Sequence, residues 1–111
     1  MQQFTPAEAA LLDRVDAAPI LGQVQAWSAI NTGTANLAGL AEQAAALADA
    51  FAALPGEIAL ETPAPVSAIT PAGQEAPVEY GQHLVLRVRP EAGRRFLLTG
   101  HMDTVFPAGH P

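Results

Sequence analysis

Two residues near Pro111, His101 and Asp103, have the types and spacing needed to hold a metal ion. They lie in the stretch LLTGHMDTVFP, residues 97–107. An imidazole that binds a metal through one ring nitrogen needs an acceptor for its other nitrogen, usually a carboxylate or a carbonyl. Residues i and i+2 of an extended segment point the same way. The spacing therefore suits a ligand and its orienting carboxylate, although a bare His-x-Asp is more often structural.

The residues before this pair predict where it lies in the fold. Residues 95–99 predict a short, continuous apolar strand of the type that is buried on both faces of a sheet. In open α/β sheets, ligands bind in the crevice outside the carboxyl ends of the strands. Gly100 lets the backbone turn there without a side-chain clash. We therefore expect His101 just beyond the end of a buried strand.

Helices are expected before the strands. Thr5 and Glu8 predict a capping box at the start of the first helix, and Pro19 is expected to stop or kink it. The apolar face of this helix would consist of Leu11, Leu12 and Val15. A second short helix would carry Ile20, Leu21, Val24 and Trp27.

A longer helix is predicted over residues 35–54, capped by Asn31 or Thr34 and ended by Pro55-Gly56. Its apolar residues alternate at intervals of three and four, which is typical of a helix face packed in a core. These residues are Leu37, Leu40, Ala44, Leu47, Phe51 and Leu54.

The second half of the chain alternates in the manner of strands. Strands are predicted over residues 57–61 and 83–89, and a short one over 66–69 inside a loop or irregular edge rich in proline and alanine. The segments 84–88 and 95–99 could pair as a hairpin. Helices followed by strands favour an α/β layered fold, and 111 residues fit one domain.

Composition excludes several classes of function. The net charge of −6 argues against a general nucleic-acid binder. The sequence contains no run of 18 or more apolar residues, so no membrane-spanning helix is expected. The first residues do not form a secretory signal, and the absence of cysteine is compatible with a reducing cytoplasm. Four of the five arginines fall between residues 87 and 95, where they indicate solvent-facing strand edges or a small anion patch.

The stretch LLTGHMDTVFP resembles the first metal-binding motif of the zinc-dependent aminoacylase and glutamate carboxypeptidase family of metallopeptidases. This family includes the acetylornithine deacetylases and the succinyl-diaminopimelate desuccinylases. INTGTANLAGLAEQAAALADAFAAL, residues 30–54, resembles the segment of the family in which a small polar turn precedes a long helix. Arg89-Pro90 also matches, so the resemblance covers most of residues 20–107.

The resemblance implies a role for each matched residue. His101 matches the histidine that binds one of two zinc ions, and Asp103 matches the catalytic aspartate that buttresses it. Gly100, Thr104 and Val105 match the framework of the motif. The implied reaction is hydrolysis of an amide bond, in a peptide or an N-acyl-amino acid, by metal-activated water. Cobalt or manganese could replace zinc, since a single imidazole does not discriminate.

The resemblance also implies that residues 1–111 are the amino-terminal part of an α/β catalytic domain with helices packed on a mixed β-sheet in three layers. The remaining metal ligands, the general base and a dimerisation domain follow this motif in the family. The chain alone is therefore expected to be inactive, and a homodimer is expected only for the full-length protein.

Alternatives remain open at this stage. The chain could be a small non-catalytic α/β binding module with a vestigial metal site, or one half of a split hydrolase. His83 is expected to be structural or at the surface, whereas His110 could swing towards His101 from a terminal loop.

Overall fold

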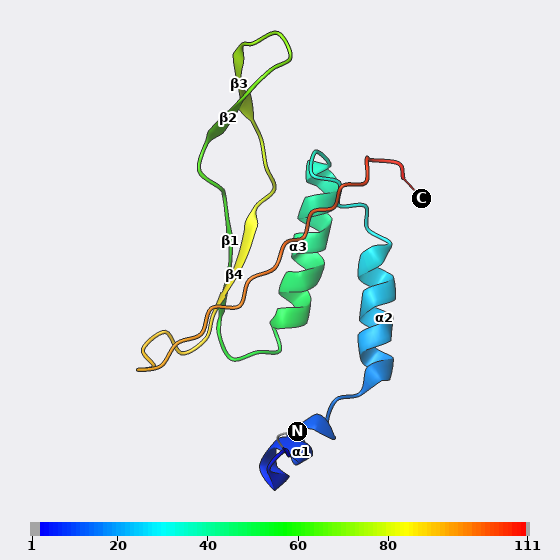
Figure 1. Ribbon diagram of the computed structural model, residues 1–111, viewed down its shortest axis with the longest axis vertical. Helices are drawn as coiled ribbons and strands as arrows, with labels where there is room; N and C mark the ends of the chain where they lie inside the picture. Colours follow the sequence, from blue (N-terminus) through cyan, green and yellow to red (C-terminus); the bar gives the residue numbers. More distant parts are fainter. Residues whose placement is uncertain (1–2, 111) are drawn as a thin grey trace.

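The computed structural model describes residues 3–110, and Figure 1 shows the arrangement of the elements. Within these residues the chain forms three helices followed by four strands. The helices are α1 (Pro6–Leu12), α2 (Ala17–Ser28) and α3 (Leu37–Phe51). The strands are β1 (Glu57–Glu61), β2 (Val66–Ile69), β3 (Glu75–Val78) and β4 (His83–Arg87). This is an α/β arrangement, as the sequence predicts.

The first two helices begin as their sequences indicate. Thr5 and Glu8 form the predicted capping box of α1, in which each side chain bonds the backbone of the other. Helix α1 is shorter than expected, because Asp13 ends it before Val15. The prediction that Pro19 stops or kinks the first helix is wrong. Pro19 lies in the first turn of α2. Backbone N–H groups in the first turn have no acceptor within the helix, so a proline there costs no helical hydrogen bond.

Helix α3 has the predicted core face in part. Leu40 and Ala44 are 6% and 2% exposed, and they are the buried apolar residues of the described chain. Phe51, on the same face, is more than one-third exposed. The helix is capped by Asn36, whose side chain accepts from the Gly39 N–H, and not by Asn31 or Thr34.

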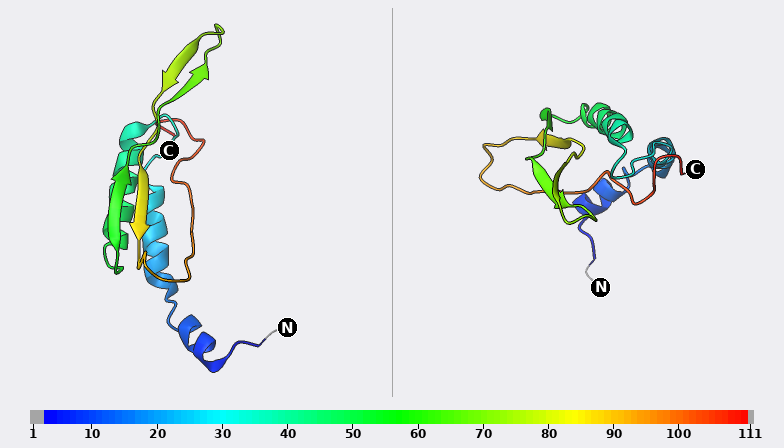
Figure 2. Two further views of the ribbon diagram at one scale, coloured as in Figure 1. Left: turned by 90° about the vertical axis from the view of Figure 1, so that its left-hand side faces the viewer. Right: turned by 90° about the horizontal axis from the view of Figure 1, so that it is seen from above.

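The strands pair as two separate antiparallel ribbons. β1 pairs with β4 in a register that joins Glu57 to Arg87 and Glu61 to His83. β2 and β3 form a hairpin that projects beyond the end of α3 (Figures 1 and 2). The predicted strand over 66–69 is confirmed as β2, while the expected loop over 62–77 also contains part of β3. Helix α3 packs on the β1–β4 ribbon.

The predicted buried strand over 95–99 is wrong. These residues form no regular structure, and Leu97 and Leu98 are 87% and 93% exposed. The predicted hairpin between 84–88 and 95–99 is also wrong, because β4 pairs with β1 instead. Apolar side chains alone cannot hold a strand in place when no neighbouring strand bonds its backbone. The segment after β4 instead returns along the molecule to the N-terminal end of α3 (Figure 1).

The described chain leaves much apolar surface open. The radius of gyration is 18.5 Å, against about 13 Å for a compact domain of about 100 residues. The accessible surface of 9334 Å² compares with roughly 5,800 Å² for a folded monomer of this size.

Among the helices of residues 3–110, none combines the length and apolar character needed to cross a membrane.

Candidate functional site

His101 and Asp103 contact one another as their spacing predicts. The His101 Nδ1 atom lies 2.9 Å from the backbone oxygen of Asp103 and 3.3 Å from its Oδ1 atom. The side chain of His101 is 85% exposed and that of Asp103 is 42% exposed. The pair therefore stands at the surface on an irregular segment, not at the end of the buried strand that the sequence predicts.

The contacts of His101 determine which ring nitrogen can bind a metal. The hydrogen-bond partner of Nδ1 is the backbone oxygen of Asp103, which can only accept, so this bond requires the proton on Nδ1. In the neutral ring the lone pair is then on Nε2. This arrangement, in which an acceptor holds one ring nitrogen and leaves the other for a metal, is typical of histidine ligands.

Asp103 is held in turn by a residue from a distant part of the chain. The Thr34 hydroxyl donates to Asp103 Oδ2 at 2.8 Å, across 69 positions of sequence. This hydrogen bond is the main cause that lowers the pKa of Asp103. Desolvation opposes it, and smaller effects of His101 add to the lowering. The carboxylate is thus ionised; it accepts from Thr34 and lies 3.3 Å from the ring nitrogen of His101.

Two backbone segments hold this arrangement together, and we call them the clasp: residues 31–36 before α3 and residues 103–107. Gly33 and Thr104 form a parallel bridge, in which the Thr34 N–H donates to Thr104 O and the Thr104 N–H donates to Thr32 O. Asn31 adds a bond from its Nδ2 to the backbone oxygen of Pro107 at 2.9 Å. The clasp therefore places the His-Met-Asp segment at the N-terminal end of α3.

The two glycines of this region allow the close approach. A Cβ atom on Gly33 would clash with the backbone oxygen of Phe106, and one on Gly39 would clash with the backbone oxygen of Asn31. Asn36 fills the corner between them, donating from Nδ2 to both oxygens of Asn31. The sequence indicates Asn31 and Thr34 as turn and capping residues. No local pattern indicates that these two residues bond Pro107 and Asp103.

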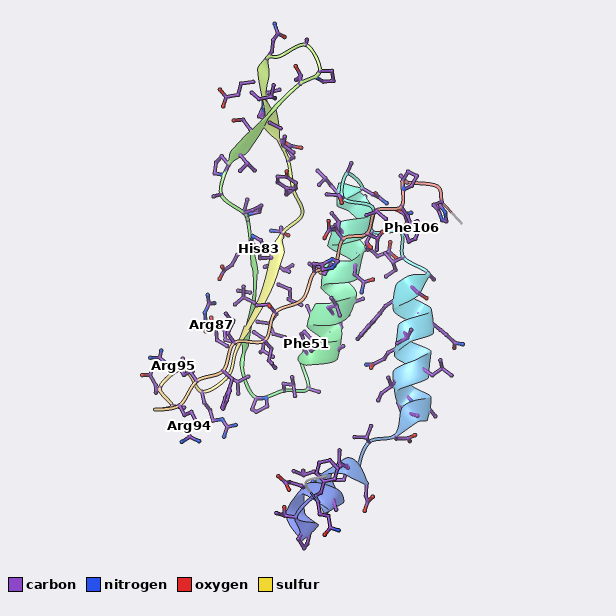
Figure 3. All side chains as sticks on the ribbon, viewed as in Figure 1. Phe51, His83, Arg87, Arg94, Arg95 and Phe106 are labelled. Carbon is purple, nitrogen blue, oxygen red and sulfur yellow. The ribbon has the colours of Figure 1, made fainter. Side chains whose placement is uncertain are left out.

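The other two histidines lie outside the His101–Asp103 pair, although each of them lines a hollow that His101 also lines. His83 begins β4, and it faces the same hollow of about 720 Å³ as His101 without joining the His101–Asp103 pair. His110 stacks against Phe106, with ring centroids 4.6 Å apart. Arg87, Arg94 and Arg95 lie on and beyond the end of β4 (Figure 3), and Arg87 pairs with Glu61 at 2.8 Å. This pairing raises the pKa of Arg87, first through the hydrogen bond and then through the charge.

The donor set fits one ligand of a zinc site and not a whole site. A catalytic zinc ion usually takes three protein ligands and a water. In residues 3–110 no cluster of three or more His, Cys, Asp or Glu side chains is placed to bind a metal. His101 offers one nitrogen with its supporting carboxylate already in place.

Comparison with known proteins yields no match for this chain among family models, curated proteins or solved structures.

Proposed function

We propose that this chain is the amino-terminal part of a di-zinc hydrolase that cleaves amide bonds in peptides or N-acyl-amino acids. The observation that supports the proposal is the contact between His101 and Asp103, in which the ring nitrogen Nδ1 lies 2.9 Å from the backbone oxygen of Asp103 and 3.3 Å from its Oδ1 atom. The motif itself supplies the family resemblance. The proposal includes the three-layer fold, a cytoplasmic location and a dimer of the full-length protein.

His101 would hold one zinc ion through Nε2, and Asp103 would fix the ring. When bound, zinc lowers the pKa of a water molecule and polarises the substrate carbonyl. The further ligands and the general base would come from residues beyond those described, since these hold no complete cluster. The part played by this chain is to orient the His101 ring and to keep its proton on Nδ1.

The exposed apolar surface supports a larger catalytic domain over an independent binding module. Phe96, Leu97 and Leu98 stand almost fully exposed beside the candidate ligand. Soluble monomers rarely leave large contiguous apolar patches open. A further part of the catalytic domain would cover the apolar side chains of this segment.

The test is an assay of the complete gene product on N-acyl-amino acids and dipeptides. We expect hydrolysis that a chelator abolishes and added Zn²⁺ restores. His101→Ala should remove the activity, and Asp103→Ala should lower metal affinity or activity about 10–100-fold, as is usual when the partner of a ligand is removed.

Thr70→Val is the control, because it removes a side-chain hydroxyl at the turn between β2 and β3, away from the pair, and should leave activity and metal content unchanged. Activity that survives chelation or His101→Ala would contradict the proposed role of the metal. Zinc-dependent hydrolysis by residues 1–111 alone would contradict the proposal that the chain is one part of the catalytic domain.

A further inference from the structure

Thr34 lies outside the motif but contacts Asp103, the residue that holds the candidate ligand His101. Its hydroxyl lies 2.8 Å from Asp103 Oδ2 and 3.3 Å from the backbone oxygen of Thr104. The hydroxyl has a single proton, and the shorter contact to a charged acceptor makes the carboxylate its partner. The two oxygens of Asp103 are thus divided, Oδ2 towards Thr34 and Oδ1 towards His101.

This division fixes the carboxylate. A carboxylate held at one end only can rotate about its terminal torsion, which has broad minima. With Oδ2 bound to Thr34, the rotation that presents Oδ1 to His101 is selected. The Nδ1 atom of His101 then bonds the backbone oxygen of Asp103 at 2.9 Å, with the charged Oδ1 atom 3.3 Å away on the same side, and Nε2 keeps its lone pair for a metal.

The side chain of Thr34 can be separated from its backbone. The Thr34 N–H bonds Thr104 O at 3.1 Å, and any non-proline residue at position 34 would keep this bond. Thr34 is exposed, so its methyl group adds little to the core. Removing only the hydroxyl should therefore leave the clasp closed and release one end of the carboxylate.

We propose that Thr34 is a positioning residue, whose hydroxyl orients Asp103 and thereby keeps His101 in the form protonated on Nδ1. The effect of Thr34 on catalysis rests on the proposed function, whereas its effect on the orientation of Asp103 and His101 does not. Thr34 is not expected to contact the substrate or the metal.

The experiment is nitrogen NMR of the histidine rings in the 111-residue chain, with no metal present. Spectra are recorded at about pH 8, above the ordinary histidine pKa of about 6.5, so that the rings are neutral. His101→Gln assigns the signals. We expect wild-type His101 to be protonated on Nδ1. Thr34→Val should lose part of this form to the one protonated on Nε2, and Thr34→Ser should retain it.

The amide signals of residue 34 and Thr104, which bond across the clasp, report whether it stays closed. Thr70→Val is the control for removing a remote threonine hydroxyl. The proposal is overturned if Thr34→Val leaves the His101 proton on Nδ1, or if Thr34→Ser behaves as Thr34→Val does. It is also overturned if wild-type His101 carries its proton on Nε2, a result that requires no variant to fold. None of these results depends on hydrolysis, so a failure of this inference and a failure of the proposed function are distinguishable.

Discussion

At His101, a single neighbouring residue, Asp103, holds the ring through a hydrogen bond to its backbone oxygen. The backbone oxygen and a carboxylate oxygen of Asp103 meet the same nitrogen, which is possible because the two residues are only two positions apart. This short-range part of the site follows from the sequence. The bond from Thr34 to the other carboxylate oxygen spans 69 positions, and no local pattern predicts it.

Glu8 gives a prediction about pH at the residue scale. Its pKa is lowered because its carboxylate accepts the Thr5 N–H and then the Thr5 hydroxyl. A carboxylate with a depressed folded pKa stabilises the fold fully above its unfolded pKa, about 4.3, and this contribution is lost as pH falls through the folded value. We expect α1 to lose helicity in acid below about pH 4. Carbon chemical shifts of residues 6–12 measure this loss.

Glu8→Gln is the matched control, because glutamine can occupy the same capping-box position without a charge that titrates. Its α1 helix should show a much flatter pH dependence. An equal loss of helicity in Glu8→Gln would show that another group causes the acid effect.

At the scale of elements, the sequence predicts what local patterns decide. Helices α1, α2 and α3 and strands β1, β2 and β4 lie where capping residues, periodicity and alternation indicate. Residues 95–99 do not form the predicted strand, because a strand needs a neighbouring strand to bond its backbone and β4 is already bonded to β1. The same limit explains why the cap of α3 was misplaced. Asn31 is engaged by Asn36 and Pro107, which leaves Asn36 as the cap.

Two helical glycines make a matched pair for testing the clasp. A glycine inside a helix costs about 1 kcal/mol relative to alanine, so Gly22→Ala in α2 should stabilise the chain by up to that amount. A Cβ on Gly22 meets nothing within 4 Å. Gly39→Ala should instead destabilise by about 1–3 kcal/mol, because its Cβ would overlap the Asn31 backbone oxygen.

Urea unfolding followed by circular dichroism measures both variants. Gly39→Ala should also weaken the protection of the Thr104 amide against hydrogen exchange, while Gly22→Ala should not. Equal stabilisation by both substitutions would contradict the close packing of residues 31–36 against the first turn of α3.

At the scale of the whole molecule, two leucines distinguish the small core from the open surface. Leu40→Ala removes a buried side chain and should destabilise the 111-residue chain by about 2–5 kcal/mol. Leu98→Ala removes an exposed one and should change the unfolding free energy by no more than about 0.5 kcal/mol. Thermal unfolding measures both effects.

The same pair of variants in the complete gene product tests whether a further part of the protein covers residues 95–99. There we expect Leu98→Ala to approach the cost of Leu40→Ala. If Leu98→Ala leaves the unfolding free energy unchanged in both proteins, residues 95–99 are not covered in the complete protein. That result would contradict the larger catalytic domain.

The clasp also bears on the order of folding. It joins residues some 70 positions apart, so closing it turns most of the chain between α3 and the motif into one large loop. Loop closure has an entropic cost that grows with the length of the loop, while α1, α2 and the β2–β3 hairpin need only near neighbours. The local elements should therefore form early and the clasp late. The bond from Thr34 to Asp103 would then be the last contact of the site to form, so a nascent or damaged chain would not yet hold the Asp103 carboxylate in place.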